Sequence, residues 1–175
     1  MDSSVVLVET FDRVRNVVHS VVGGLTATQL AARPDPDANS IAWLIWHLTR
    51  IQDDHVADVA GVEQAWTADG WADRFALPFD DAAHGYGMTR DEVATVRVES
   101  GSLLTGYHDA VHEQTVAYLG HLAEMDASEL DRVVDESWDP PVTLGVRLVS
   151  VISDDLQHAG QAAYVRGLIE RADRA

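Results

Sequence analysis

Two histidines and one aspartate from distant parts of the chain have the types and spacing of metal ligands. Asp154 and His158 lie four residues apart, and His47 stands far earlier in the sequence. Residues four apart on a helix share one face, so this carboxylate and imidazole can hold one ion from one side while His47 closes the site from another helix. Two imidazoles and one carboxylate leave coordination positions open for water or a substrate atom, as in catalytic rather than structural zinc sites.

The apolar residues around these three side chains predict that all of them face inward. His47 follows Trp43 by four residues and precedes Ile51 by four, so it points where they point. Asp154 and His158 flank the direction set by the apolar residues of their helix, which are Leu144, Val151, Ala162 and Val165. Unpaired charged groups are costly to bury. Three such residues that meet inside a bundle therefore predict a compensating cation between them.

Plainer roles stay open for each of these residues. His47 can be a core histidine with its hydrogen bonds satisfied, and Asp154 can pair with an arginine or a helix end. His158 can bond Gln161 or a backbone carbonyl. Asp155 competes with Asp154 for the carboxylate position, because a residue three before His158 also shares its face.

The other histidines are weaker candidates. His108 and His112 are also four apart, but they are turned partly aside from the apolar stripe of their helix. His55 and Asp54 lie one turn beyond Ile51 and could approach the metal site. The remaining histidines are expected in loops or facing solvent: His19, His84 and His121.

Four long helices are expected to position these residues. Apolar side chains recur at spacings of three and four, which favours helices over strands despite the high valine content. Ser40 and Thr143 are suited to cap the helices that carry the three candidate ligands. The expected helices cover residues 4–22, 41–59, 100–122 and 143–171.

A long connection separates the second and third helices. Residues 63–88 are irregular and rich in aromatic side chains, which predicts a loop packed on the body, and Thr89 to Glu92 form a capping box for a short helix. Short turns are expected at 26–32 and 126–134. The pattern predicts an all-α protein, a four-helix bundle with a long crossover between helices 2 and 3, as one domain over residues 1–175.

Composition narrows the chemistry and the partners. The chain has no cysteine, so a metal must be held by His, Asp or Glu. Its net charge is -17 and all twelve basic residues are arginine, which argues against nucleic acid and anionic membranes as partners. No apolar run is long enough to span a bilayer and the N-terminus lacks a basic leader, so we expect a cytoplasmic protein.

Two sequence motifs resemble those of a known family. The run NSIAWLIWHLTR (39–50) resembles the His-Leu element of the DinB/YfiT-like superfamily of helical bundles. The run DDLQHAGQAAYVRGLI (154–169) resembles its His-x-Gly-Gln element, followed by Tyr-x-Arg-Gly. The connector GLTATQLAARP extends the similarity over most of the chain, and the nearest branch contains mycothiol-dependent maleylpyruvate isomerase.

The resemblance implies a metal site and a thiol cofactor. It places metal ligands at His47, at His158 and four residues before His158, where relatives have His or Glu and this chain has the shorter Asp154. Zinc is the first expectation, with nickel and iron as alternatives, because such ligands suit all three. A low-molecular-weight thiol, a small-molecule substrate and a homodimer are implied by the resemblance alone.

Two functions are therefore open. The first is a metal-dependent enzyme acting on a small molecule, a thiol-dependent transferase or isomerase or else a hydrolase, in which water or thiol at the metal reacts. Arg166 could then clamp a substrate carboxylate or merely form an ion pair, and Gln161 could orient a ligand imidazole or make a plain interhelical contact. The second is a non-catalytic metal- or ligand-binding stress-response bundle.

Overall fold

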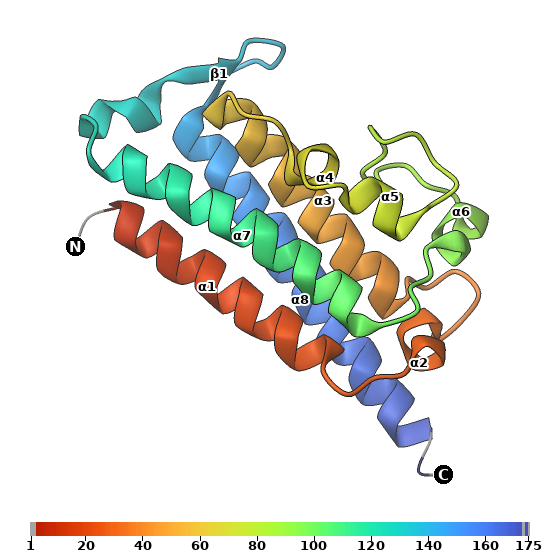
Figure 1. The fold of residues 1–175 in the computed structure, drawn as a ribbon. Coiled ribbons are helices and arrows are strands. Elements are labelled where there is room, and N and C mark those ends of the chain that lie inside the picture. The colour runs from red at the N-terminus through yellow and green to blue at the C-terminus, as the bar shows by residue number, and fades with distance from the viewer. Residues whose placement is uncertain (1–2, 173, 175) are drawn as a thin grey trace.

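Four long helices form the body of the molecule in a computed structural model that describes residues 3–172 and 174 (Figure 1). They are α1 (Ser3–Val22), α3 (Ile41–Ala60), α7 (Gly101–Ala123) and α8 (Leu144–Ala172). Contacts between neighbours run around the bundle in the order α1, α7, α3 and α8. The expected all-α four-helix bundle is confirmed.

The direction of the helices explains the long connection. α3 and α7 run the same way, and α1 and α8 run the opposite way (Figure 1). Contacts between α3 and α7 agree, because Thr49 meets His108 and, further along both helices, Gln52 meets Thr115. Two neighbouring helices that run in the same direction need a connection that crosses the length of the bundle, so the predicted crossover is confirmed.

The crossover contains more regular structure than the sequence predicted. It forms two short helices, α4 (Ala65–Ala68) and α5 (Trp71–Phe75), followed by α6 (Arg90–Thr95). The rings of Trp66, Trp71 and Phe75 are buried and all pack around Tyr107 of α7. These contacts fix the aromatic segment on the body, as expected, although its helical turns were too short to show a period.

The shorter helices begin at capping residues, and a small hairpin follows α7. Thr26 with Gln29 and Thr89 with Glu92 form the capping boxes of α2 (Ala27–Ala31) and α6. After α7 a 3-10 helix, η1 (Ala127–Asp131), leads to a two-stranded antiparallel sheet of β1 (Val133–Asp135) and β2 (Val142–Thr143). This hairpin could not be predicted from the sequence, because strands of three and two residues carry no readable alternation.

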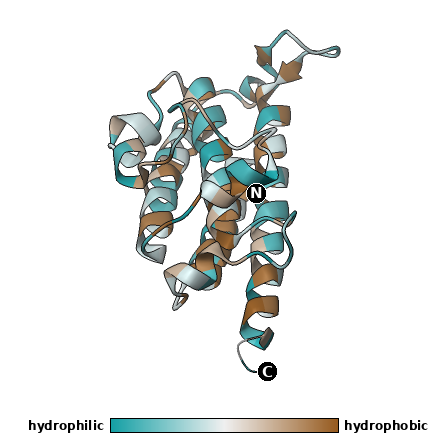
Figure 2. Ribbon diagram, turned by 90° about the vertical axis from the view of Figure 1, so that its right-hand side faces the viewer, coloured by the Kyte–Doolittle hydropathy of each residue, from teal (hydrophilic) through white to brown (hydrophobic). Residues whose placement is uncertain are grey.

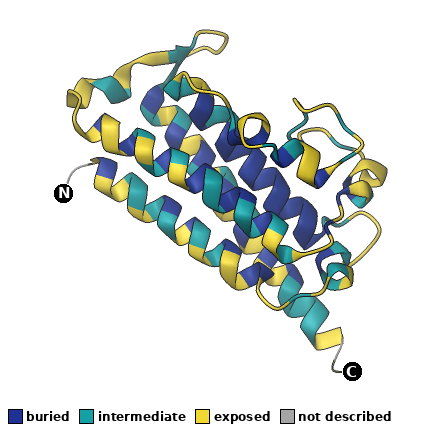
Figure 3. Cartoon of the chain, viewed as in Figure 1, coloured by how far each residue is buried: buried dark blue, intermediate teal, exposed yellow. Residues whose placement is uncertain are grey.

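α3 is the central helix, and most of its residues are buried (Figure 3). It begins at Ser40, whose hydroxyl accepts a hydrogen bond from the Trp43 amide, and ends at Gly61 in the left-handed conformation. α7, α8 and the crossover surround it, so polar side chains on α3 must find partners inside the protein.

The apolar core is divided into two clusters. Along the helices, hydrophobic and hydrophilic residues alternate in bands (Figure 2). On α8, Leu148 and Val151 belong to one cluster and Ala159 and Ala162 to the other, with the fully buried Asp155 between them. Among the described residues, no helix is long and apolar enough to cross a membrane.

Candidate metal centre

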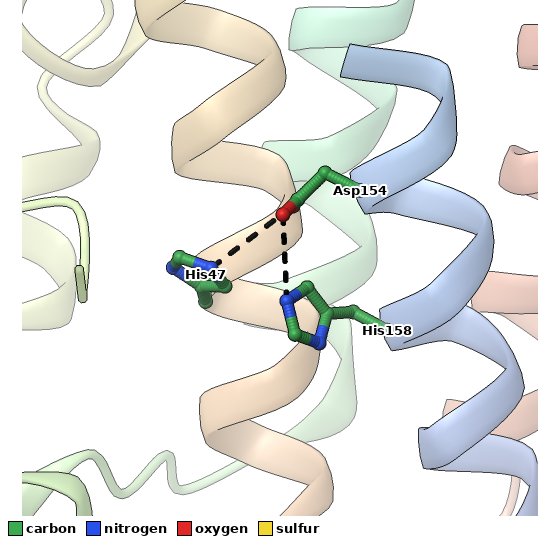
Figure 4. Close-up of side chains that lie close together, drawn as sticks. All are labelled: His47, Asp154 and His158. Carbon is green, nitrogen blue, oxygen red and sulfur yellow. Dashed lines mark ion pairs between the residues drawn. The ribbon is translucent and has the colours of Figure 1, made fainter. Parts of the chain in front are cut away.

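α3 and α8 bring the three predicted ligands together. Figure 4 shows His47 of α3 facing Asp154 and His158 of α8, and the ring centroids of the two histidines lie 4.8 Å apart. One ligand atom from each residue lies within 4.8 Å of the other two. In the part of the chain that the structure describes, this is the only cluster of three His, Asp or Glu side chains with metal-binding spacing.

The separations fit an ion better than direct hydrogen bonds. The Nε2 atom of His47 lies 4.0 Å from one Asp154 oxygen, and the Nε2 atom of His158 lies 3.5 Å from the other. Two ligand atoms that are each ~2.1 Å from a shared zinc ion at a tetrahedral angle lie about 3.4 Å apart. The Oδ2 atom of Asp154 is also buried and has no hydrogen-bond partner among the described residues. Such an orphaned carboxylate oxygen is the expected state of a ligand without its ion.

A backbone carbonyl fixes the tautomer of His47. Its Nδ1 atom meets the carbonyl oxygen of His84. Since a carbonyl only accepts hydrogen bonds, Nδ1 must carry the proton, and in the neutral ring Nε2 keeps its lone pair. Burial lowers the pKa of His47, an effect that outweighs the raising effect of this hydrogen bond. The ring is therefore neutral near pH 7, with Nε2 directed at Asp154.

The second histidine is oriented in the same way by a side chain. The Nδ1 atom of His158 lies 3.1 Å from the Oε1 atom of Gln161, so Nδ1 donates and Nε2 faces Asp154. Gln161 thus contacts the imidazole of His158, a candidate ligand. Burial acts to lower the pKa of His158, but the neighbouring Asp154 carboxylate and, less strongly, Gln161 outweigh burial and raise the pKa above the ordinary 6.5.

The centre is closed on one side and open on the other. His47 is only 4% exposed, and its ring stacks on Trp43 with centroids 4.6 Å apart. Trp43 also meets the edge of His158. The side chains of Asp154 and His158 are 32% and 18% exposed, so solvent reaches the centre from the α8 side. Asp154 and His158 are therefore the solvent-facing members of the group, and His47 is covered on one face by Trp43.

The rival carboxylate lies apart from this group. Asp155 points into the core, where both of its oxygens lack a partner among the described residues. Burial raises its pKa well above the ordinary value, and the charge of Asp154 adds to the effect. The structure therefore brings Asp154, and not Asp155, to the two histidines.

The other candidate histidines do not join the centre. His112 bonds Asp12 of α1 at 2.7 Å, and His108, predicted to turn partly aside, is fully buried with its Nδ1 3.2 Å from the Thr49 hydroxyl. Nearer the other end of α3, His55 lies beside Asp54 and the Arg147 guanidinium. The loop or solvent positions expected for the rest match the structure for His19, His84 and His121.

Arg166 is engaged at the end of α1. One of its guanidinium nitrogens donates to the carbonyl oxygens of Ser20, Val21 and Gly23, and its Nε donates to Glu170. A guanidinium held by three carbonyls caps the C-terminus of α1. The structure thus shows the ion pair that the sequence allowed, and it does not bring Arg166 to the three candidate ligands.

The sequence did not predict the buried polar groups and the close backbone approach that lie near His47. Arg50 and Asp53 are almost completely buried on α3 and lie 3.7 Å apart, and Tyr107 donates to Asp53. Gly85 has a positive φ of 95°, and a Cβ there would lie 2.7 Å from His47 Nδ1. The sequence did contain one signal for the buried pair: Arg50 and Asp53 are opposite charges three residues apart in an otherwise apolar helix. Charges in such a position need partners inside the protein.

The fold and the site define the class of protein, and similarity to known proteins defines its family. A four-helix bundle with this crossover and a His-Asp-His group shared by α3 and α8 is a DinB-like protein. A family model described as mycothiol-S-transferase matches residues 6–171, so the chain belongs to the mycothiol-S-transferase family, a DinB/YfiT-like family. The resemblance seen in the two sequence motifs is confirmed.

A solved structure supports the same assignment. The chain is similar to a conserved protein from Enterococcus faecalis, known from its crystal structure, with 32% sequence identity and a TM-score of 0.88. The match covers 97% of this chain and 98% of that chain, so the two share the whole fold. Comparison with curated proteins gives no match.

Proposed function

We propose that the protein is a transferase that joins the thiol mycothiol to a small electrophile and depends on a divalent metal held by His47, Asp154 and His158. Family membership supports the thiol and the transfer, because the family description names both. The single observation that carries the metal is the meeting of two imidazole Nε2 atoms with one carboxylate, all ligand atoms lying within 4.8 Å.

The residues present fit a divalent cation. Each histidine has its Nδ1 engaged, by the His84 carbonyl and by Gln161, which leaves both Nε2 lone pairs for an ion. Asp154 adds a negative charge and an unpartnered buried oxygen. Zinc is the first candidate, because three protein ligands of these types with an open position are typical of catalytic zinc.

Side chains around the metal would shield it on one face and leave it accessible on the other. A bound divalent cation supplies a Lewis acid that lowers the pKa of a thiol and so favours the nucleophilic thiolate. Trp43 shields the buried side of the centre, and the exposed edges of Asp154 and His158 leave the path by which thiol and electrophile enter. The net charge of -17 favours cation capture from solution.

The experiment measures metal content and thiol transfer on the same preparations. Untagged protein, purified without added metal, is analysed for elements as wild type, as His158→Ala and as His121→Ala. His121 is a matched control, since it is an exposed histidine on α7. We expect about one equivalent of metal in wild type and in His121→Ala and a stoichiometric loss in His158→Ala. Mycothiol consumption with a bimane electrophile should follow the metal content.

Two results would overturn parts of the proposal. Equal stoichiometric metal in wild type and His158→Ala would remove His158 from the centre. Bound metal without transfer from mycothiol to any tested electrophile would instead favour the non-catalytic metal-binding bundle.

A further inference from the structure

Arg50 stands out because it is a fully buried cation one turn from a candidate metal ligand. Its side chain has no exposed surface. Burying a guanidinium is costly unless its donors are satisfied, so its partners show what the residue holds. One nitrogen donates to Gln64 at 2.7 Å, and the guanidinium carbon lies 5.1 Å from the centre of the Trp66 ring.

Two further partners are backbone carbonyls of the crossover. The Nε atom of Arg50 donates to the Ala83 oxygen at 3.1 Å, and a terminal nitrogen donates to the Asp81 oxygen at 3.3 Å. The backbone from Asp80 to Thr89 forms neither helix nor strand, and Asp80, Asp81 and Ala82 are exposed. The buried guanidinium therefore ties an otherwise irregular segment to α3.

Neutralising Asp53 does not explain these contacts. Asp53 already accepts hydrogen bonds from the backbone amides of Ala65 and Trp66, at 2.9 and 2.8 Å, and from the Tyr107 hydroxyl at 2.7 Å. A cation could offset this carboxylate without reaching the crossover. The bonds from Arg50 to the carbonyls of residues 81 and 83 are therefore not needed to neutralise Asp53. They hold the segment directly before His84, whose carbonyl contacts His47.

The tied segment is the one that orients His47. Directly after Ala83, the carbonyl of His84 accepts from His47 Nδ1, and Gly85 lies so close that a Cβ would be 2.7 Å from the same atom. The same added Cβ would be 3.2 Å from the rings of Trp43 and Trp46. The position of this backbone therefore decides which ring nitrogen of His47 carries the proton and which is free.

We infer that Arg50 is a positioning residue for the metal centre, which acts by holding the backbone of residues 81–83 so that the His84 carbonyl fixes His47 with Nε2 toward Asp154. This inference rests on the proposed function, in which His47 is a metal ligand. Loss of such outer contacts around a ligand histidine typically weakens metal binding by about 10- to 100-fold.

The main test uses Arg50→Lys with Tyr107→Phe as its matched control. Lysine keeps a positive charge beside Asp53, but its single ammonium cannot reproduce the planar fork that reaches two carbonyls and Gln64. Tyr107→Phe disturbs the same buried network, since it removes the bond to Asp53 and the 3.3 Å contact with Arg50, but it leaves the crossover carbonyls alone. Zn²⁺ affinity is measured by calorimetric competition with a chelator.

The second readout needs no metal. Nitrogen-15 NMR of the metal-free protein reports the tautomer of His47, which should be the Nδ1–H form in wild type and Tyr107→Phe and a mixture in Arg50→Lys. Zn²⁺ affinity should fall about 10- to 100-fold in Arg50→Lys only. If Arg50→Lys does not fold, the double variant Arg50→Met with Asp53→Asn removes both charges, and the same two results are expected of it.

The outcomes separate this inference from the proposed function. An unchanged His47 tautomer and unchanged Zn²⁺ affinity in the Arg50 variant would overturn the positioning role, as would equal losses in the Arg50 variant and Tyr107→Phe. If wild type fails to bind Zn²⁺ at His47 while the tautomer still shifts in the Arg50 variant, the proposed function fails and the coupling between Arg50 and His47 stands.

Discussion

His47 and His158 both present Nε2 to Asp154 because each has its Nδ1 engaged by an acceptor, one a backbone carbonyl and the other Gln161. The two rings differ in electrostatics. Burial lowers the pKa of His47, whereas Asp154 raises the pKa of His158 against the effect of burial. In the metal-free protein, His158 is therefore the ring of the two that gains a second proton at the higher pH, and protons compete with a cation at its Nε2 atom.

Metal affinity should depend on pH through His158. Its raised pKa means that protons compete with the cation for this ring at a higher pH than for a free histidine, so Zn²⁺ affinity should fall as the pH drops below the pKa of His158. The pKa of each ring is measured by NMR titration of the metal-free protein. We expect His158 to titrate above 6.5 and His47 below it, and Asp154→Asn to lower the pKa of His158. A His158 that titrates below 6.5 in wild type would contradict this assignment.

At the scale of elements, the sequence predicted what periodic patterns and caps encode. The long helices, the caps Ser40 and Thr143 and the shared face of Asp154 and His158 follow from spacing. The tether between Arg50 and the crossover could not be predicted, because backbone carbonyls have no sequence signature. The burial of His108 was also missed, since its place on α7 is decided by how α3 packs there.

The burial of His108 on α7 should make the fold sensitive to acid. Complete burial lowers its pKa to about 3, so the folded protein keeps it neutral while the unfolded chain protonates near 6.5. Its contribution to stability is therefore present above pH 6.5 and is lost as pH falls toward 3, by about 1.4 kcal/mol per pH unit. Chemical denaturation between pH 7 and 4 measures the free energy of unfolding at each pH. In His108→Leu this free energy should change less steeply with pH than in wild type.

The exposed His121 of the same helix provides the control for this effect. His121→Leu should keep the acid sensitivity of the wild type. If His108→Leu loses free energy of unfolding as steeply as wild type when the pH falls, His108 is not the buried neutral group described above.

At the scale of the whole molecule, the centre exists only when the fold brings α3 and α8 together. His47 lies far from Asp154 and His158 along the chain, so the unfolded protein offers no assembled site. For the same reason the sequence alone does not determine the whole site. Motifs identified the family and the three side chains, but the choice of Asp154 over Asp155 as the neighbour of both histidines needed the packing of two helices.

Metal binding should accordingly stabilise the folded protein. With free Zn²⁺ at about 100 times its Kd, the free energy of unfolding should rise by about 2.7 kcal/mol, which corresponds to an increase in Tm of roughly 5–10 °C for a chain of this size. Differential scanning calorimetry of chelator-treated and zinc-loaded protein measures the shift. His121→Ala should keep the increase in Tm on zinc binding, and His158→Ala should lose it. Equal Tm values with and without zinc in wild type would contradict a preformed metal site.

The most direct test of the metal centre is anomalous X-ray diffraction from crystals of the zinc-loaded protein, recorded on both sides of the zinc absorption edge. We predict one strong anomalous peak between α3 and α8, ~2.0–2.1 Å from the Nε2 atoms of His47 and His158 and within bonding distance of an Asp154 oxygen. A stoichiometric zinc peak elsewhere, or one bound by Asp155 instead of Asp154, would contradict the centre described here.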